Sequence, residues 1–362
     1  MNKTKILIAT GGTGGHVFPA YSLAKFMIKN NFLVELTSDA RGQHFLKNYK
    51  EIKLELISST TIFKKNSIAV IFSVFKIFLA FIKSIIYLLK SKPKIIFGMG
   101  GYSSFPVCLA AKFLSIPFII YENNLYLGKT NRYLLPFAKK LFVSYADLKG
   151  YDKKYTSKIY EVGNIIRENI LNYENNNTQQ LNEKDISILI LGGSQAAKSF
   201  AEKLPNIFKK CKEDNIKLKI YQQCLINQSD DLKKVYHNLK IDSEIFNFSN
   251  QLTGYFSKID FAITRAGSSM LAELLNCNIP IITIPLPSSA DQHQLKNAEY
   301  FESKGYGFLV KEEDIDKKLF LLIKTIYKDK KLLNKIIIRQ KEHSDKKVFK
   351  KILNQVKEMI ND

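Results

Sequence analysis

The feature that most constrains the fold of this chain is a run of glycines near its start, Gly11-Gly12-Thr13-Gly14-Gly15. The short apolar run Ile6–Ala9 precedes it and is typical of a buried parallel strand, and Pro19–Lys29 follows it with helical spacing. Glycines let the backbone approach a ligand closely, and the N–H groups at a helix start attract negative charge. The order of strand, glycine-rich turn and helix therefore predicts an α/β domain whose first turn binds phosphate.

Two commoner phosphate-binding motifs do not fit this chain. The dinucleotide fingerprint counted from Gly12 requires glycine at position 17, which is Val17. A P-loop ending at Gly128-Lys129-Thr130 requires glycine where Asn123 stands. Neither an NAD enzyme nor a P-loop kinase is favoured. A tight turn without a ligand is the alternative for the first glycine run, although such a turn does not need so many destabilising glycines.

Short apolar runs alternate with helical patterns along the whole chain, in two series. Such alternation predicts parallel sheets with right-handed crossovers. We expect two doubly wound, Rossmann-like domains facing across a cleft, residues 1–165 and 166–344, with ligands at the carboxyl ends of the strands. The expected strands are Lys5–Ala9, Phe32–Thr37, Leu54–Ile57, Ile95–Gly98, Pro117–Tyr121, Leu141–Ser144, Ile159–Val162, Ile186–Leu191, Leu218–Tyr221, Glu244–Phe248, Phe261–Thr264, Ile279–Ile284 and Phe308–Val310.

The charge is concentrated in the first half of the 362-residue chain. Residues 1–165 hold 24 Lys+Arg against 8 Asp+Glu, a net +16 of the total +22. This asymmetry favours an anionic partner such as nucleic acid, a membrane or a phosphorylated substrate. The four cysteines show no C-x-x-C spacing, so neither a zinc site nor a disulfide framework is indicated.

The segment Ile68–Leu89 is almost entirely apolar and long enough to span a bilayer. Ser73, Lys76, Lys83 and Tyr87 nevertheless recur at helical spacing and share one stripe. Three structures fit this pattern: a transmembrane span, a buried core helix, and a helix whose exposed apolar face meets the membrane surface.

Two more glycine loops follow predicted strands, Gly98–Ser104 and Gly192–Gln195. Near the end of the second series, Thr264–Glu273 predicts a strand end, a small turn and a helix start. There the Glu273 carboxylate suits the helix dipole and can accept hydrogen bonds from sugar hydroxyls. Asp291–Ala298 supplies amides and a histidine at the next turn. The D-x-D segment Asp314-Ile315-Asp316 is interpreted as helix capping rather than a metal site.

Taken in order, these motifs resemble the MurG family of bacterial peptidoglycan glycosyltransferases. The resemblance covers Gly11–Pro19, Gly98–Tyr102, Glu122–Asn124 with Leu127–Asn131, Val162–Arg167, Gly192–Gln195, Arg265–Glu273 and Asp291–Ala298. It implies a two-domain glycosyltransferase of the B type that transfers N-acetylglucosamine from UDP-N-acetylglucosamine to lipid I, a lipid-diphosphate muramyl acceptor, with inversion. A C-terminal helix at about 345–362 would pack back on the first domain.

The resemblance also implies site residues. His16 is the candidate general base, because imidazole ordinarily titrates near neutral pH. The alternative is that His16 only binds the acceptor diphosphate or orients a loop. No metal or cofactor is implied. Donor contacts are expected at Thr13, Gly14, Asn124, Arg167, Ser194, Gln195, Glu273 and Gln294, and acceptor-diphosphate contacts at Gly14, Gly15, His16, Gly100, Gly101 and Tyr102.

The expected partners are therefore UDP-N-acetylglucosamine, lipid I and the anionic cytoplasmic face of the bacterial inner membrane, where the protein would bind peripherally. Two rivals share part of the pattern. A UDP-N-acetylglucosamine 2-epimerase has the same two-domain plan but needs no basic, apolar face on its first domain. A nucleic-acid-binding protein would be expected to show an RNA or DNA module, and no such module is recognisable here.

Overall fold

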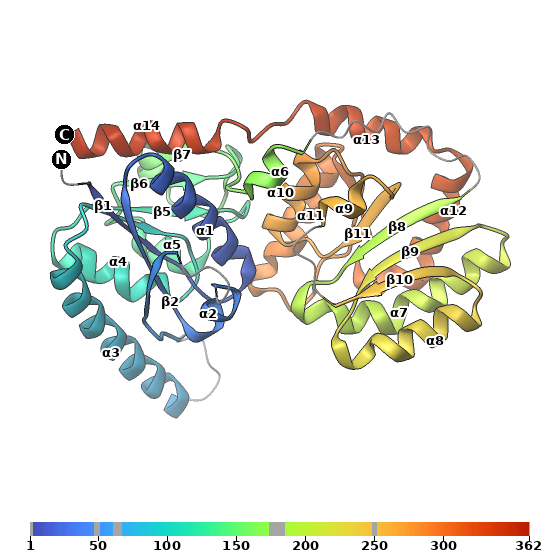
Figure 1. The fold of residues 1–362 in the computed structure, drawn as a ribbon, viewed down its shortest axis with the longest axis horizontal. Coiled ribbons are helices and arrows are strands. Elements are labelled where there is room, and N and C mark those ends of the chain that lie inside the picture. Colours follow the sequence, from blue (N-terminus) through green and yellow to red (C-terminus); the bar gives the residue numbers. More distant parts are fainter. Residues whose placement is uncertain (1–2, 47–50, 61–66, 174–184, 248–251, 362) are drawn as a thin grey trace. The chain divides into compact units, whose positions relative to one another are not determined.

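The computed structural model describes residues 3–46, 51–60, 67–173, 185–247 and 252–361, apart from the side chains of residues 67, 68, 194–197 and 361. The chain divides into two compact units (Figure 1). The first comprises residues 1–168 together with 345–362, and the second comprises residues 169–344. Residues 166–168, assigned to the second domain from the sequence, therefore group with the first unit.

The first unit is built on a parallel sheet with strand order β3-β2-β1-β4-β5-β6-β7. In the centre, Ile6 of β1 lies opposite Val34 of β2 and Ile95 of β4. Helices cover the sheet, so the central strands are buried along their length and are almost continuously apolar. The strands are β1 (Lys5–Ala9), β2 (Leu33–Ser38), β3 (Lys53–Leu56), β4 (Ile95–Gly98), β5 (Phe118–Glu122), β6 (Lys140–Val143) and β7 (Ile159–Glu161).

The helices of the first unit connect these strands, except for the last helix, which is formed by the C-terminal residues of the chain. They are α1 (Gly14–Lys29), α2 (Ala40–Leu46), α3 (Ser67–Ser91), α4 (Ser104–Phe113), α5 (Lys129–Leu134) and α14 (Val348–Asn361), with a short helix η1 (Lys153–Lys158) before β7 and α6 (Glu168–Leu171) at the boundary between the units.

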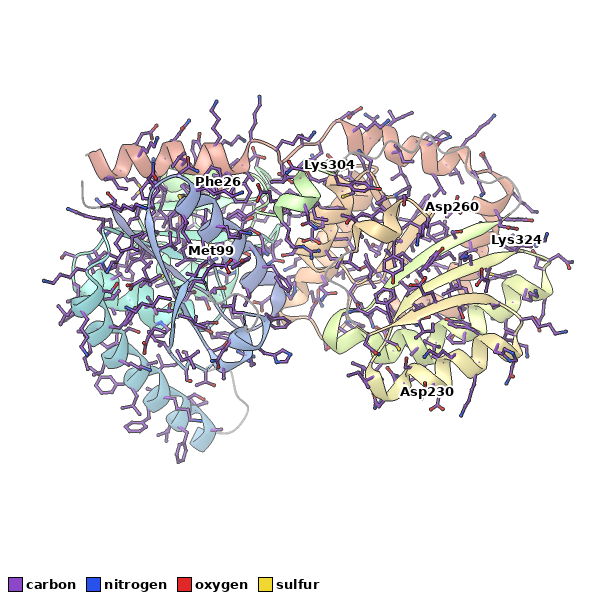
Figure 2. The ribbon with its side chains drawn as sticks, viewed as in Figure 1. Phe26, Met99, Asp230, Asp260, Lys304 and Lys324 are labelled. Carbon is purple, nitrogen blue, oxygen red and sulfur yellow. The ribbon has the colours of Figure 1, made fainter. Side chains whose placement is uncertain are left out.

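Several contacts hold α14, and the residues just before it, on the first unit. Phe26, labelled in Figure 2, lies in α1. The ring of Phe349 in α14 stacks on the Phe26 ring, with centroids 4.8 Å apart. The Asp345 carboxylate accepts hydrogen bonds from the backbone N–H and the side-chain amide of Asn164, at 2.8 and 3.1 Å. Gly163 has φ +100°, and a Cβ there would lie 2.5 Å from Asp345 Oδ1, so glycine is required.

The second unit repeats the plan with a parallel sheet of order β10-β9-β8-β11-β12-β13. Its strands are β8 (Ile186–Leu191), β9 (Leu218–Gln223), β10 (Asp242–Phe246), β11 (Phe261–Thr264), β12 (Ile281–Thr283) and β13 (Gly307–Leu309). Its helices are α7 (Gly193–Glu213), η2 (Ile226–Gln228), α8 (Ser229–Asn238), α9 (Thr253–Phe256), α10 (Ser268–Asn276), η3 (Ala290–Gln292), α11 (His293–Ser303), η4 (Glu312–Asp314), η5 (Ile315–Leu319), α12 (Phe320–Lys328) and α13 (Lys331–Lys341).

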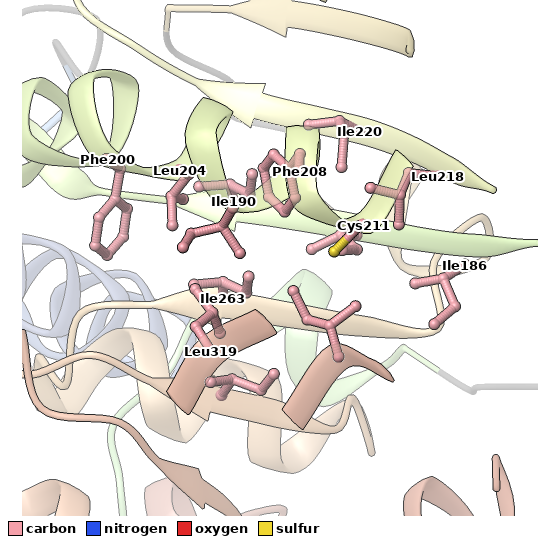
Figure 3. Close-up of a cluster of buried hydrophobic side chains, with 14 of the residues drawn as sticks. Ile186, Ile190, Phe200, Leu204, Phe208, Cys211, Leu218, Ile220, Ile263 and Leu319 are labelled. Atoms are coloured by element: carbon pink, nitrogen blue, oxygen red, sulfur yellow. The ribbon is translucent and has the colours of Figure 1, made fainter. Parts of the chain in front are cut away.

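The core of the second unit forms where α7 packs on the sheet (Figure 3). Phe200, Leu204, Phe208 and Cys211 recur along one face of α7, and they are fully buried against strand residues such as Ile190. The spacing of three to four residues is that of one helical face. This packing fixes α7, and with it the glycine turn that precedes α7, relative to β8.

Every strand expected from the sequence is present, with bounds that differ by no more than two residues. The two doubly wound parallel units predicted from the alternating pattern are therefore confirmed. The first helix differs from the prediction, since α1 begins at Gly14 instead of Pro19 and Pro19 lies inside it.

Candidate active site

The early start of α1 has a consequence for the first glycine loop. Pro19 has no N–H, so the carbonyl of Gly15, four residues earlier, loses its usual helical partner. In the structure this carbonyl accepts a hydrogen bond from the side-chain amide of Asn123, at 3.3 Å. Asn123 follows β5, so the proline inside the helix allows the first loop to be tied to a segment two strands away in the sheet order.

A buried aspartate also holds the first loop. Asp39, which follows β2, accepts hydrogen bonds from the backbone N–H groups of Gly12 and Gly42, at 2.9 and 2.8 Å. Burial raises the pKa of Asp39, but these hydrogen bonds and the adjacent Arg41 outweigh burial and lower its pKa. The carboxylate is therefore ionised at neutral pH and fixes Gly12, whose φ of +81° favours glycine.

The second glycine loop lies against the ring of His16. Gly100 and Gly101 have φ of +82° and +75°. A Cβ on Gly100 would lie 3.1 Å from His16 Cε1, and one on Gly101 would lie 3.5 Å from His16 Cδ2. The half-buried imidazole thus packs between the first and second loops, and the half-buried Tyr102 follows directly. Both loops follow neighbouring strands, β1 and β4.

A third segment at this edge of the sheet is organised by Glu122, the last residue of β5. Its buried carboxylate accepts hydrogen bonds from the backbone N–H groups of Asn124 and Gly128, at 3.1 and 2.9 Å. The side-chain amides of Asn124 and Asn131 donate to the same carboxylate, both at 2.9 Å. Asn124, expected to contact the donor, therefore has a fixed orientation. Sequence reasoning missed Glu122 as the organising residue.

Arg167, another expected donor contact, belongs to the first unit, where its guanidinium lies 5.8 Å from the ring centroid of Phe18 in α1. Arg167 lies in the first unit because the chain is anchored there three residues earlier, where the Asn164 N–H donates a hydrogen bond to Asp345. Of the expected residues, the first unit thus contains Thr13, Gly14, Gly15, His16, Gly100, Gly101, Tyr102, Asn124 and Arg167.

The second unit carries the remaining expected residues at the carboxyl ends of β8, β11 and β12. Gly193, with φ +63°, begins α7, and the side chains of Ser194 and Gln195 lie outside the described part of the structure. Glu273 is 6% exposed in α10, which begins just after the end of β11. Adjacent parallel strands direct these turns to one edge of the sheet.

Gln294 lies at the start of α11 and is tied to the turn after β12. Its side-chain oxygen accepts a hydrogen bond from the N–H of Leu286, at 3.0 Å. Asp291 and Gln292, just before the helix, are both left-handed, with φ of 50° and 54°. Backbone strain of this kind is typical of ligand-binding turns, where surrounding contacts hold it in place.

The D-x-D segment does not cap a helix by side-chain hydrogen bonds, contrary to expectation. Asp314 instead pairs with Lys318 one turn later, at 2.8 Å, because the two side chains share a helical face. Among the described residues, no group of three or more His, Cys, Asp or Glu side chains is arranged to hold a metal ion.

Helix α3 presents an apolar face to solvent. Phe72, Phe75, Phe78 and Leu79 are each at least 50% exposed, and only 17% of its most apolar window is buried. The buried-core alternative is therefore wrong. The predicted stripe is only partly buried: Ser73 and Tyr87 face the unit, while Lys76 and Lys83 are exposed. The buried stripe of α3 is made mostly of small or polar residues, Ser73, Ala80, Ser84, Tyr87 and Ser91, together with Leu88.

One carboxylate fixes the C-terminal part of α3. Glu35 of β2 is buried and accepts hydrogen bonds from the hydroxyls of Tyr87 and Ser91, at 2.7 and 2.5 Å. Lys5 and Lys53 lie 3.4 and 3.1 Å from its other oxygen. Burial raises the pKa of Glu35, but the hydrogen bonds and lysine charges outweigh burial and lower its pKa to about 2.

Comparison with known proteins decides the family. Residues 6–143 match the glycosyltransferase family 28 N-terminal domain, and residues 187–357 match its C-terminal domain. Over 354 residues, 98% of this chain and 95% of the relative, the chain is 38% identical to the UDP-N-acetylglucosamine--N-acetylmuramyl-(pentapeptide) pyrophosphoryl-undecaprenol N-acetylglucosamine transferase of Pelagibacter ubique (strain HTCC1062). The chain belongs to glycosyltransferase family 28. The enzyme of the same name from Rickettsia felis is 35% identical, over 86% of this chain and 87% of that one.

Solved structures share the fold of this family 28 glycosyltransferase. Acinetobacter baumannii MurG matches with a TM-score of 0.78 over 99% of this chain and 100% of that chain, at 24% identity. A UDP-N-acetylglucosamine 2-epimerase matches with a TM-score of 0.66 over 98% and 96% of the two chains, at 14% identity. The fold alone therefore does not distinguish a transferase from an epimerase. The sequence identity to the transferases distinguishes the two classes of enzyme.

Proposed function

We propose that this chain transfers N-acetylglucosamine from UDP-N-acetylglucosamine to the N-acetylmuramyl-pentapeptide of a pyrophosphoryl-undecaprenol acceptor, lipid I, in peptidoglycan synthesis. The observation that carries the proposal is the 38% identity to a transferase of this name across nearly the whole chain. Both family 28 domains are present, so the chain holds both halves of such an enzyme.

In the proposed reaction, the C4 hydroxyl of the acceptor sugar attacks the anomeric carbon of N-acetylglucosamine. The new C–O bond forms as the bond to the diphosphate breaks, the hydroxyl proton passes to a base, and UDP leaves with the bonding electrons. His16 is the proposed base, since its ring lies at the junction of the first two glycine loops. The helix start at Gly14 and Gly15 would attract the acceptor diphosphate.

The second unit would bind the donor. Glu273 is buried near the start of α10, where its carboxylate would accept hydrogen bonds from the ribose hydroxyls. Gln294 would contact the transferred sugar, and Ser194 and Gln195 would bind the diphosphate at the start of α7. From the first unit, the Arg167 guanidinium would stabilise the charge on the departing UDP, and Thr13, Gly14 and Asn124 would complete the donor contacts.

The decisive experiment is transfer of radiolabelled N-acetylglucosamine from UDP-N-acetylglucosamine to a short-chain lipid I analogue, with product analysis by chromatography. We expect a labelled disaccharide-lipid that forms only when the acceptor is present. Incubation with UDP-N-acetylglucosamine alone is the control. Formation of an N-acetylmannosamine product in that control, without transfer, would refute the transferase and favour the epimerase.

We further propose that the first unit binds the cytoplasmic face of the inner membrane peripherally through α3. The exposed aromatic and aliphatic side chains of α3 supply an apolar contact, and residues 1–165 carry a net +16. Anionic lipid attracts each nearby lysine or arginine by about 1 kcal/mol, and salt screens this attraction. Buried apolar side chains would add a part that salt does not screen.

Sedimentation with vesicles of phosphatidylglycerol and phosphatidylethanolamine tests this surface. We expect binding that weakens but persists in high salt. The variant Phe75→Ser/Phe78→Ser/Leu79→Ser should lose the salt-resistant part and keep its fold, because these side chains are exposed. Ile226→Ser, an exposed apolar residue of the second unit, is the matched control. Membrane release only by detergent would indicate a transmembrane span instead.

A further inference from the structure

A buried arginine stands at the end of β11, among the turns that carry the expected donor contacts. Arg265 is 5% exposed. Its Nη1 donates hydrogen bonds to Glu312 Oε2, at 2.6 Å, and to the carbonyls of Ile284 and Pro285, at 3.1 and 3.4 Å. The guanidinium carbon lies 4.6 Å from the ring centroid of Phe200 in α7, so the cation also packs on an aromatic face.

Glu312, which follows β13, extends the network to α7. Its Oε1 accepts hydrogen bonds from the Ser199 hydroxyl and the Lys203 ammonium group, at 2.8 and 3.1 Å. Burial raises the pKa of Glu312, but the bonds from Arg265, Ser199 and Lys203 outweigh burial and lower its pKa to about 2. The carboxylate is therefore ionised at neutral pH and joins Arg265 to the helix after the third glycine loop.

The pair thus ties together the ends of four neighbouring βα units. Ser199 is five residues beyond Ser194 on α7, about one and a half helical turns. Arg265 directly precedes the turn into α10, which carries Glu273, and it also holds the carbonyls after β12, from which the chain leads to Gln294. Sequence analysis singled out each of these turns, but neither Arg265 nor Glu312 as their common link.

We infer that Arg265 and Glu312 form a positioning pair, which sets the relative geometry of the turns after β8, β11, β12 and β13 for binding a nucleoside diphosphate sugar. This inference rests on the proposed function. Neither residue needs to touch the donor, because each acts through the turns that it holds. The pair would preorganise the site before the donor arrives, so that binding energy is not used to assemble the turns.

The geometry favours positioning over simple stabilisation. Arg265 Nε and Nη2 are buried without a hydrogen-bond partner in the described part of the chain, which is unfavourable for stability. Well-packed apolar side chains often replace a buried ion pair with no loss of stability. An apolar pair could not, however, hold two carbonyls, a hydroxyl and an ammonium group at once. What the ion pair adds is therefore directional contact to several turns.

The test measures UDP affinity by calorimetry, donor KM and kcat by the transfer assay, and melting temperature, on the full chain. Arg265→Lys and Glu312→Gln keep similar volumes but remove some of the directional contacts. We expect each to raise the UDP Kd and the donor KM about tenfold, because part of the binding energy must then be used to order the turns. At saturating donor, kcat should change less than about threefold, because neither residue contacts the reacting atoms. Asp314→Asn, which breaks the exposed pair with Lys318, is the matched control and should change none of these values.

The double variant Arg265→Met/Glu312→Leu separates positioning from stability. We expect its melting temperature to approach that of the wild type while the UDP Kd stays raised. If both the melting temperature and the UDP Kd return to wild-type values, the pair acts through stability alone and the inference is overturned. Should the double variant fail to fold, wild-type UDP affinity in both conservative variants would overturn it equally. Wild-type protein that does not bind UDP would instead refute the proposed function.

Discussion

Replacing Glu35 by glutamine should destabilise the first unit by about 3 kcal/mol at pH 7. The buried carboxylate joins β2 to α3 through Tyr87 and Ser91, and to the neighbouring strands through Lys5 and Lys53. Lowering its pKa from 4.5 to about 2 corresponds to about 3 kcal/mol of folding free energy. Glutamine keeps the size of the side chain but leaves both lysines without their counter-charge.

The sign of the pH dependence follows from the direction of the shift. A carboxyl group whose pKa is lower in the folded state stabilises the fold above its unfolded pKa. This stabilisation is complete above about pH 5.5 and is lost as the pH falls from about 4.5 toward 2. The difference between wild type and Glu35→Gln should therefore shrink to about half at pH 3.

Urea unfolding at pH 7, 5 and 3 measures the free energy of unfolding. Hydrogen exchange of peptides from β2 and α3 shows whether the loss of stability lies in the first unit. The control is Glu168→Gln, which removes the exposed ion pair with Lys29. Exposed pairs typically contribute less than about 1 kcal/mol. The reasoning is refuted if Glu35→Gln costs no more than Glu168→Gln, or if the gap to wild type is as large at pH 3 as at pH 7.

Three further predictions concern the candidate active site. His16→Ala should lower kcat by about 10²–10⁴ with unchanged UDP affinity, and turnover within a few-fold of wild type would show that His16 is not the base. Glu273→Ala should weaken UDP binding at least tenfold by calorimetry, since a hydrogen bond to a charged group contributes about 1.5–3 kcal/mol; unchanged binding would mean that the ribose lies elsewhere. Gly100→Ala should lower turnover but not UDP affinity, because φ is +82° and the new Cβ would lie 3.1 Å from His16. Gly254→Ala, where a Cβ meets nothing within 4 Å, is its control, and equal turnover in the two variants would contradict the close contact with His16.

The strands were predictable because local sequence determines them. A parallel strand covered on both faces is a short apolar run bounded by turn residues, and β1, β4 and β8 are of this kind. The glycine loops were predictable for the same reason, since each needs backbone conformations or close approaches that other residues do not tolerate.

The start of α1 was not predictable from the usual preference for proline in the first helical turn. Pro19 is tolerated inside the helix because Asn123 satisfies the carbonyl that proline leaves unpaired. That partner lies more than a hundred residues away along the chain. The burial pattern of α3 likewise depends on contacts with β2, since its apolar composition alone fits three different structures.

Three of the residues whose role sequence reasoning missed share one property. Asp39, Glu122 and Glu312 are acidic, and each accepts hydrogen bonds from turns that carry the expected site residues. None lies in a glycine run, and a single acidic residue near a strand end usually indicates only a solvated side chain. Their role appears once the parallel sheets bring distant strand ends together. In this glycosyltransferase the glycine loops provide close backbone approach, and carboxylates outside those loops hold the surrounding turns and helix starts in place. Substrate binding should therefore depend on residues that do not touch the substrate.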